Sequence, residues 1–309
     1  MNNSNTINSN LEKVIVIVGP TAIGKTNISL DLCKKFNGEV INCDASQMKK
    51  DLNIGTAKID LTKTDVVHHL IDIIECNDTF SCANFQKEAR KLIRDINSRS
   101  KIPFIVGGTG LYVSSVIYDY DLSPIAKASN HDTYDHLTNE ELHALLTKID
   151  KESAEKIHMN NRIRVIRAIE CAKNGYKISS NNGKKNKVYD ALLICLTTDR
   201  EILYQRINKR VDLMIEEGFI DECKSLIKKG IDISKLPDIG YKHINSYLIG
   251  ELSFENALDE IKKDTRHYAK RQMTWFRNQM DCVFIDMNYN NPNNTFEKVS
   301  MIIDEYLKK

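Results

Sequence analysis

The sequence of 309 residues has no apolar run near the roughly 18 residues that a membrane-spanning helix needs, so no membrane span is expected. Residues 1–10, MNNSNTINSN, have neither an apolar core nor basic residues, which argues against a secretory signal, and we expect a disordered tail. The formal net charge of +2 gives no overall attraction to nucleic acid, so such a partner would need a local basic surface. These absences favour a cytoplasmic protein.

The eight cysteines form no Cys-x-x-Cys pair and no cluster with histidine, so the spacing of a zinc site is absent. Most of them lie in apolar patterns, which is typical of reduced core cysteines in the cytosol. With 41% hydrophobic and 28% charged residues, the composition is that of an ordinary globular protein. The length permits one large domain with an insertion, or two domains.

Short apolar runs alternate with helical patterns along much of the chain. The runs expected to be strands are Val14–Gly19, Glu39–Asp44, His69–Ile74, Ile102–Gly108, Ala191–Thr198 and Cys282–Asp286. Helical patterns such as Lys25–Phe36 and Ser81–Ser98 separate them. The repeated order of strand, helix and strand predicts an α/β fold with a parallel sheet covered by helices on both faces.

The alternation breaks down between about Ile117 and Lys187, where polar connections join helical patterns. We therefore predict a mostly helical insertion domain over residues 118–187, within an α/β core of residues 11–117 and 188–309. From Arg200 to Met280 the pattern predicts long helices with few breaks, and the Asn-rich Asn288–Asn294 segment is expected to be a loop.

The stretch GPTAIGKT fits the phosphate-binding pattern G-x-x-x-x-G-K-[ST] and lies between an expected strand and an expected helix. Its residues are Gly19, Pro20, Thr21, Ala22, Ile23, Gly24, Lys25 and Thr26. Backbone N–H groups and the helix N-terminus would bind an anion, Lys25 would add a full charge, and the Thr26 hydroxyl could bind Mg²⁺. The loop therefore predicts a site for a diphosphate or larger phosphate; a chance match in a glycine turn is the alternative.

A P-loop ATPase or GTPase usually carries a second apolar strand that ends in an acid, which holds the metal. The run Ile102–Gly108 leads into Gly-Gly-Thr without an acid, whereas Glu39–Asp44 ends in a carboxylate. Asp44 would lie at the carboxyl edge of the sheet, where ligands bind, as a metal ligand, a general base or only a helix N-cap. No Asn-Lys-x-Asp motif is present, which argues against a GTPase.

Further motifs occur in an order that resembles the bacterial tRNA dimethylallyltransferases. They are INCDASQ, NIGTAK, HHLIDI, ANFQKEA, VGGTGLY, RVIRAIE, IGYK and DTRHYAKRQMTWFRN, and the resemblance runs from about Val14 to Asn278. It implies a P-loop NTPase-like core with a helical insertion and long C-terminal helices. It also implies transfer of a dimethylallyl group from dimethylallyl diphosphate to N6 of the adenine at position 37 of tRNAs that read codons beginning with U.

The resemblance implies catalytic roles for three residues. Asp44 would be the base that takes the proton of the adenine amine, and Lys25, with Mg²⁺ on Thr26, would neutralise the leaving diphosphate. Thr109 would be a hydroxyl partner of the amine or of the diphosphate. The adenine would be flipped out of the tRNA loop into a tunnel that the diphosphate enters from the other side.

The resemblance also implies a set of tRNA-binding residues. They are Asp44, Ala45, Ser46, Gln47 and Thr109, then Ile163, Arg164, Val165, Ile166 and Arg167, then Gly240, Tyr241 and Lys242, and finally Lys270, Arg271, Gln272, Met273, Thr274, Trp275, Phe276 and Arg277. Arg164 and Arg167 are three residues apart and would share a helix face. We expect a monomer that binds the anticodon stem-loop through these basic segments.

Other cations are open to two interpretations. Lys262 and Lys263 precede the KRQMTWFR segment and could be a solvated face without a tRNA role. Arg206 and Arg210 are one helical turn apart and could close over the diphosphate as a lid, or form surface ion pairs with Glu201 or Asp212.

The sequence departs from the usual motifs at several positions. Ala45 replaces a serine, Lys49 a tyrosine, Asp51 a glycine and Asn53 an aspartate, and HMNNRIR (158–164) replaces HPNDPRR. The serine matters most, because a hydroxyl beside the base is expected to orient it or to contact the adenine.

Three other functions remain as alternatives. An adenylate isopentenyltransferase would need neither the helical insertion nor the basic C-terminal segment, both of which are present. A P-loop kinase of a small metabolite would require a nucleotide lid and usually a second acid at a strand end. A tRNA-binding protein without activity would explain Ala45, but not the retained Asp44, Lys25 and Thr109.

Overall fold

The computed structural model describes residues 11–120, 122, 131–176, 178 and 186–309. The tail predicted over residues 1–10 lies outside them. The chain divides into two compact units, Met1–Ile117 with Lys187–Lys309, and Tyr118–Asn186.

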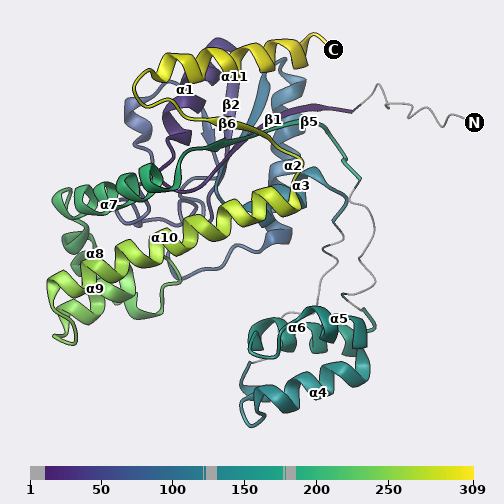
Figure 1. The fold of residues 1–309 in the computed structure, drawn as a ribbon, viewed down its shortest axis with the longest axis vertical. Coiled ribbons are helices and arrows are strands. Elements are labelled where there is room, and N and C mark those ends of the chain that lie inside the picture. The colour runs from purple at the N-terminus through teal and green to yellow at the C-terminus, as the bar shows by residue number, and fades with distance from the viewer. Residues whose placement is uncertain (1–10, 121, 123–130, 177, 179–185) are drawn as a thin grey trace, which may run out of the picture. The chain divides into compact units, whose positions relative to one another are not determined.

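A six-stranded sheet forms the centre of the larger unit (Figure 1). Its strands are paired in the order β3-β2-β4-β1-β5-β6. The strands are β1 (Lys13–Val18), β2 (Gly38–Cys43), β3 (His68–His69), β4 (Ile102–Gly107), β5 (Asp190–Thr197) and β6 (Val283–Asp286). Residues 14–18 of β1 are all fully buried, as expected for a central strand that is covered on both faces. Every pairing is parallel, so all strands present their carboxyl ends at one edge.

Eight α-helices accompany the sheet in the described part of this unit. They are α1 (Lys25–Lys35), α2 (Cys82–Ser98), α3 (Gly110–Ile117), α7 (Arg200–Glu216), α8 (Phe219–Lys228), α9 (Tyr241–Leu248), α10 (Phe254–Gln279) and α11 (Pro292–Leu307). Short 3₁₀ helices occupy Leu61–Lys63 and Ile233–Lys235. None of the described helices combines the length and the apolar character that crossing a membrane requires.

The direction of each crossover decides which face of the sheet its helix covers, because crossovers between parallel strands are right-handed. The chain moves from β1 to β2 toward the β3 edge and from β3 to β4 in the opposite direction, so α1 and α2 cover opposite faces. α11 packs against α1 (Figure 1), whereas α2 packs against α3, which in turn contacts α10. Helices therefore cover both faces, as the alternation of strands and helices predicts.

The smaller unit contains three α-helices among its described residues, α4 (Asn139–Ile149), α5 (Lys151–Lys156) and α6 (Arg162–Lys173), after a 3₁₀ helix over His131–Tyr134. α4 begins with a capping box, in which the Thr138 hydroxyl and the Glu141 carboxylate each bind the other's backbone N–H. Its apolar face, with Leu142 and Leu146, packs against that of α6 in one small core. The described part of this segment is thus mainly helical.

One predicted strand is mostly absent. β3 contains only His68–His69, and the expected continuation to Ile74 is wrong. Leu70 and Asp72 have φ angles of 62° and 54°, which an extended strand does not permit. The Asn42 amide donates to the Leu70 carbonyl (2.9 Å) and holds this turn in place.

The C-terminal part differs from expectation in two ways. α11 was not predicted; it begins at Pro292, inside the expected Asn-rich loop, with the proline in the first turn, where its missing N–H is harmless. The helices between Arg200 and Met280 are also more interrupted than predicted, because the connection from α8 to α9 holds only the 3₁₀ helix Ile233–Lys235.

Candidate active site

The phosphate loop joins the end of β1 to the start of α1. Gly24 has a φ of 104°, a left-handed conformation that glycine adopts without strain. Gly19 lies so close to β5 that a Cβ would be 2.8 Å from the Leu196 carbonyl oxygen. The N-terminus of α1 has no side-chain cap, and it opens onto the cavity that the loop lines, an arrangement that binds anions.

Lys25 folds back onto this loop. Its Nζ donates to the carbonyl oxygens of Gly19 (3.0 Å) and Pro20 (2.9 Å). Burial lowers the pKa of Lys25 to about 8, although the Asp44 carboxylate opposes the shift. A phosphate bound by the loop would favour the protonated amine, so Lys25 would gain charge when an anion binds.

Two arginines of α7 point at the loop. Arg206 Nε donates to the Ala22 carbonyl (3.0 Å), and Arg210 donates to the Thr21 hydroxyl (3.0 Å). The Arg206 guanidinium also lies 3.9 Å from the centre of the Tyr289 ring. Burial lowers the pKa of Arg210, although the charges of Asp44 and Glu217 oppose this shift.

The alternative ion pairs of these arginines are not formed within the described part of the chain. Asp212 pairs with Lys262 instead (2.6 Å), and Glu201 pairs with neither arginine. Both arginines thus bind the phosphate loop and not the two acids, and their role as a lid over a diphosphate stays a prediction.

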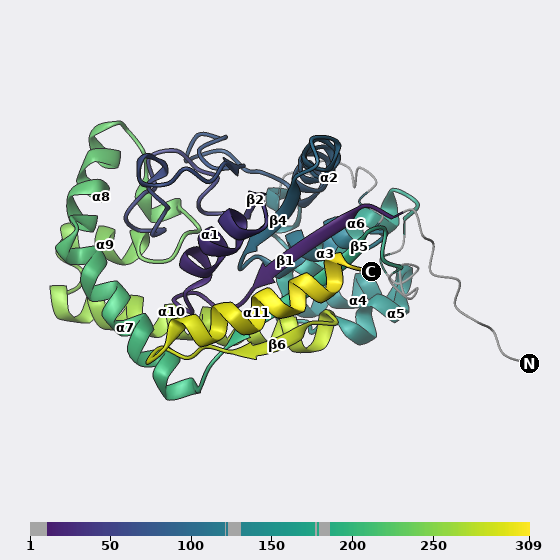
Figure 2. The same cartoon turned by 90° about the horizontal axis from the view of Figure 1, so that it is seen from above.

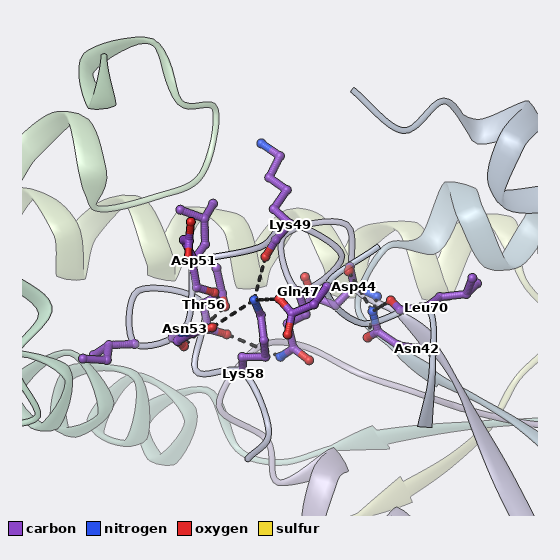
Figure 3. Close-up of polar contacts among 12 residues, drawn as sticks. Asn42, Asp44, Gln47, Lys49, Asp51, Asn53, Thr56, Lys58 and Leu70 are labelled. Atoms are coloured by element: carbon purple, nitrogen blue, oxygen red, sulfur yellow. Dashed lines mark hydrogen bonds and ion pairs between the residues drawn. The ribbon is translucent and has the colours of Figure 1, made fainter. Parts of the chain in front are cut away.

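Asp44 follows the last residue of β2 and is held by its neighbours. The Asn42 side chain both accepts from the Asp44 N–H (3.2 Å) and donates to the Asp44 carbonyl (3.1 Å; Figure 3). One carboxylate oxygen accepts from the Ser46 N–H (3.1 Å), which closes a turn. No helix follows, so Asp44 is not a helix N-cap.

Thr109 ties the end of β4 to the residues after β2. Its N–H donates to the Cys43 carbonyl (3.1 Å), and its hydroxyl accepts from the Ala45 N–H (3.3 Å). Tyr268 of α10 lies beside Thr109 and close to Asp44. Burial and the Asp44 charge raise the pKa of Tyr268, so the phenol stays protonated beside the carboxylate. Ala45 thus contributes its backbone, while the hydroxyls at this place belong to Thr109 and Tyr268.

The long helix α10 supports the phosphate loop through a buried glutamine. Gln272 accepts from the Thr21 N–H (2.9 Å) and donates to the Gly108 carbonyl (3.0 Å). A Cβ at Gly108 would lie 2.2 Å from the Gln272 amide nitrogen, and one at Gly110 would lie 2.2 Å from the Trp275 ring. The glycines after β4 therefore allow this close approach of α10.

Two cavities meet at Asp44. The larger, of about 710 Å³, is lined by the phosphate loop with Lys25, Thr26 and Arg206. The smaller, of about 460 Å³, is more apolar and is lined by residues that include Phe80, Tyr112, Ile261 and Tyr268. Residues common to both linings are Thr21, Asp44, Arg210 and Met214. The carboxylate can thus act on a group that reaches from one cavity into the other.

The larger cavity has few protein oxygens that could bind a metal. It suits Mg²⁺ that a phosphate ligand also binds better than a metal that only protein side chains hold. Thr26 and Asp44 line it, and the described residues contain no group of three or more His, Cys, Asp or Glu that could hold a metal. Mg²⁺ is commonly bound by one or two protein oxygens together with phosphate oxygens and water. The residues present therefore fit Mg²⁺ that arrives with a diphosphate.

Three departures from the usual motifs lie in one loop near the site. The buried Lys58 ammonium binds the Lys49 carbonyl (2.6 Å), the Asn53 side-chain oxygen (3.1 Å) and the Asp72 carboxylate (Figure 3). The Lys49 ammonium points away from this cluster and pairs with the buried Asp238 (2.8 Å). Asp51 has a φ of 64°, which explains why a glycine also fits there.

The KRQMTWFR segment of α10 has one exposed side and one buried side. Lys270, Arg271, Thr274 and Arg277 are exposed, and Met273 and Trp275 are half-buried. Gln272 and Phe276 are buried, at 6% and 0% exposure, so their side chains do not reach the surface in this structure, and a tRNA contact by them stays a prediction. Lys262 and Lys263 pair with Asp212 and Glu260, as expected of a surface without a tRNA role.

The other two segments implied in tRNA binding also contain both exposed and buried residues. Within the α6 segment 163–167, Ile163, Arg164 and Arg167 are exposed, whereas Val165 and Ile166 belong to the core of the smaller unit. At the start of α9, Gly240 and Tyr241 are buried and Lys242 is exposed. The buried side chains face the interior of their own unit in this structure, and a tRNA contact by these residues stays a prediction.

Reasoning from sequence missed two polar residues of the site region. Tyr268 reaches Thr109 from α10, and Glu222 of α8 binds the loop after β2. Tyr268 stands in the quoted DTRHYAKRQMTWFRN motif, which was a signal for it. No local pattern indicated Glu222, because its partners lie about 170 positions away in sequence.

Comparisons with known proteins agree with the resemblance. The model of the IPP transferase family matches residues 47–279. A tRNA dimethylallyltransferase of Anoxybacillus flavithermus is 48% identical over 285 residues, which cover 89% of this chain and 91% of that protein. The crystal structure of a full-length tRNA isopentenylpyrophosphate transferase from Bacillus halodurans is 43% identical with a TM-score of 0.73, over 96% of this chain and 97% of that one.

A structure of a eukaryotic dimethylallyltransferase acting on tRNA is 30% identical with a TM-score of 0.83, over 96% of this chain and 80% of its own. The likeness of these structures extends over nearly the whole chain, so the expected P-loop NTPase-like core is confirmed. The chain therefore belongs to the IPP transferase family.

Proposed function

We propose that this protein transfers a dimethylallyl group from dimethylallyl diphosphate to N6 of the adenine at position 37 of tRNAs that read codons beginning with U. The observation that carries the proposal is the meeting of two cavities at Asp44, one lined by a phosphate loop and the other more apolar. The names of the relatives described above support the same reaction.

The diphosphate would occupy the larger cavity as a leaving group. The loop amides, Lys25, Arg206 and Arg210 are aligned to stabilise the negative charge that grows as the carbon–oxygen bond breaks. Mg²⁺ held through Thr26 would supply further charge neutralisation of the phosphate oxygens. The loop thus serves bond cleavage at carbon, and no phosphoryl group is transferred.

The acceptor base would enter the smaller cavity. Its amine nitrogen forms a bond to the allylic carbon while diphosphate leaves, and Asp44 accepts the proton that the nitrogen loses. The hydroxyls of Thr109 and Tyr268 lie next to this point and would orient the amine. Such a base must leave its stack in the RNA before it can reach the carboxylate.

The exposed cations of α10 and α6 would bind the anticodon stem-loop of the tRNA, with the protein acting as a monomer. Lys270 and Arg277 have no acidic partner in the described ranges, so their charge is available to phosphates. Free adenylate would not need them.

The test is transfer of radiolabelled dimethylallyl diphosphate to an anticodon stem-loop and to AMP, with nucleosides identified by mass spectrometry. Isopentenyl adenosine in the RNA, at a rate far above that with AMP, is the expected result. AMP as the better acceptor would indicate an adenylate isopentenyltransferase, and hydrolysis of ATP or GTP without prenyl transfer would indicate a kinase-like or ATPase function.

A further inference from the structure

Glu222, in the first turn of α8, binds three consecutive backbone N–H groups of the loop after β2. One carboxylate oxygen accepts from Asn53 (2.8 Å) and Ile54 (2.7 Å), and the other accepts from Gly55 (3.1 Å). Successive amides that converge on one anion form a nest, the arrangement that often holds phosphate. Here a carboxylate of the same chain fills the nest and fastens the loop to α8.

Tyr241 of α9 holds Glu222 from the other side. α8 and α9 lie side by side at one end of the larger unit (Figure 2), and the Tyr241 hydroxyl donates to Glu222 (2.8 Å). Burial and the Glu222 charge raise the pKa of Tyr241, so the phenol remains a donor. A Cβ at Gly55 would lie 2.5 Å from the Tyr241 hydroxyl oxygen, so the loop is pressed against this pair.

The loop continues directly to the phosphate site. The Thr56 hydroxyl closes a turn by donating to the Leu52 carbonyl (2.6 Å), and the Thr56 carbonyl accepts from Arg210 (3.1 Å). The same guanidinium donates to the Thr21 hydroxyl of the phosphate loop (3.0 Å). Glu222 itself lines neither cavity, so it can affect the phosphate site only indirectly, through Thr56 and Arg210.

We propose that Glu222 is a positioning residue for diphosphate binding: by fixing the Asn53–Gly55 amides it places the Thr56 carbonyl that aims Arg210 at the phosphate loop. The inference rests on the proposed function, because it takes the larger cavity as the diphosphate site. It predicts that Glu222 and Arg210 act as one unit, although the carboxylate never touches the ligand.

The test is calorimetric binding of inorganic diphosphate with Mg²⁺, which requires no prenyl transfer. Arg210→Ala should raise the Kd roughly ten- to a hundredfold, as expected for a lost hydrogen bond to a charged group. Glu222→Gln replaces one accepting carboxylate oxygen with an NH₂ group, which cannot accept from the backbone N–H groups. This variant should raise the Kd about three- to tenfold. The double variant should bind within about twofold of Arg210→Ala alone, because coupled residues are not additive.

Asp221→Asn is the matched control, because Asp221 neighbours Glu222 on α8, is exposed and pairs with Lys224 (3.4 Å). It should leave the Kd unchanged. If Glu222→Gln lowers the number of binding sites per chain but not the affinity of those that remain, its role is structural and the inference is overturned. Independent, additive effects of the two substitutions would overturn it as well.

Tyr241→Phe provides a second variant if Glu222→Gln does not fold. It removes one donor from the Glu222 carboxylate and should weaken diphosphate binding in the same direction but less; an unchanged Kd contradicts the inference. A wild-type protein that does not bind diphosphate contradicts the proposed function and the inference with it. A wild-type protein that binds while Glu222→Gln binds equally well contradicts the positioning role alone.

Discussion

At the carboxyl edge of the sheet, the cations Lys25 and Arg210 both interact with the Asp44 carboxylate. Asp44 raises the pKa of Lys25, while burial and Arg210 lower it. These positive charges are partly buried and are bound to carbonyl and hydroxyl oxygens of the loop. Such a preorganised group of donors can stabilise a diphosphate leaving group without rearranging at the moment of reaction.

Asp44→Ala is expected to reduce prenyl transfer roughly a hundred- to ten-thousandfold, the usual effect of removing a positioned base. The alanine keeps the backbone bonds to Asn42, so binding of the stem-loop should stay within a few-fold of wild type. Single-turnover transfer and stem-loop titration measure the two effects separately. Turnover near that of the wild type would rule out Asp44 as the base.

The depressed pKa of Lys25 predicts a pH dependence of diphosphate affinity. The free amine has a pKa of about 8, and bound diphosphate favours its protonated form. Affinity should therefore be constant below this pH and fall as the pH rises through it, with a proton taken up on binding. Calorimetry in two buffers of different ionisation enthalpy, at pH 7 and at pH 9, measures the uptake of that proton. The Lys25→Met variant should bind diphosphate weakly, and its affinity should no longer change with pH.

At the scale of elements, the site is assembled where α10 meets the turn after β4. The Gly108 and Gly110 backbones accept the close approach of Gln272 and Trp275, and Gln272 connects this turn to the phosphate loop. Tyr268, one turn earlier on the same helix, reaches Thr109. One helix thus aligns two loops that are far apart in sequence.

Gln272→Leu should lower the free energy of unfolding by about 2–4 kcal/mol, since the Thr21 N–H and the Gly108 carbonyl would both lose their partner. Chemical denaturation measures this change. Asn278→Ala, an exposed substitution near the end of the same helix, should have little effect. An equal loss in both variants would mean that the bridge does not stabilise the loop.

At the scale of the whole molecule, positive charge is local and not global. The formal net charge is +2, and many basic residues are paired with acids of the same chain, including Lys262 and Lys263. Lys270 and Arg277 on α10 lack an acidic partner among the described residues. A nucleic acid would therefore be directed to particular surfaces.

Charge reversal at Lys270 and Arg277 should weaken binding of an anticodon stem-loop and reduce the slope of its salt dependence by roughly 0.7–0.9 per lost phosphate contact. Arg271 is left intact because it also lines the smaller cavity. Titrations at several salt concentrations measure the slope, and affinity for dimethylallyl diphosphate should not change. Lys263→Glu, at a paired lysine, is the control; a loss as large as that of the double variant would contradict a specific RNA surface.

The sequence by itself determined the elements whose signals are local. The apolar runs predicted β1, β2, β4 and β5 to within a residue or two, and GPTAIGKT predicted the phosphate loop with Lys25 and Thr26. The position of Asp44 at the end of β2 followed from the same reasoning, because parallel strands share one carboxyl edge. These features depend on side-chain periodicity and loop chemistry, which short windows contain.

Only the tertiary structure decided which residues surround those features. The shortening of β3 depends on the left-handed backbone at Leu70 and Asp72, and the burial of Gln272 and Phe276 depends on the face that α10 turns inward. The nest around Glu222 and the aim of Arg210 join segments about 150 to 170 positions apart. Such contacts form when packing brings distant segments together, so no local pattern in the chain could indicate them.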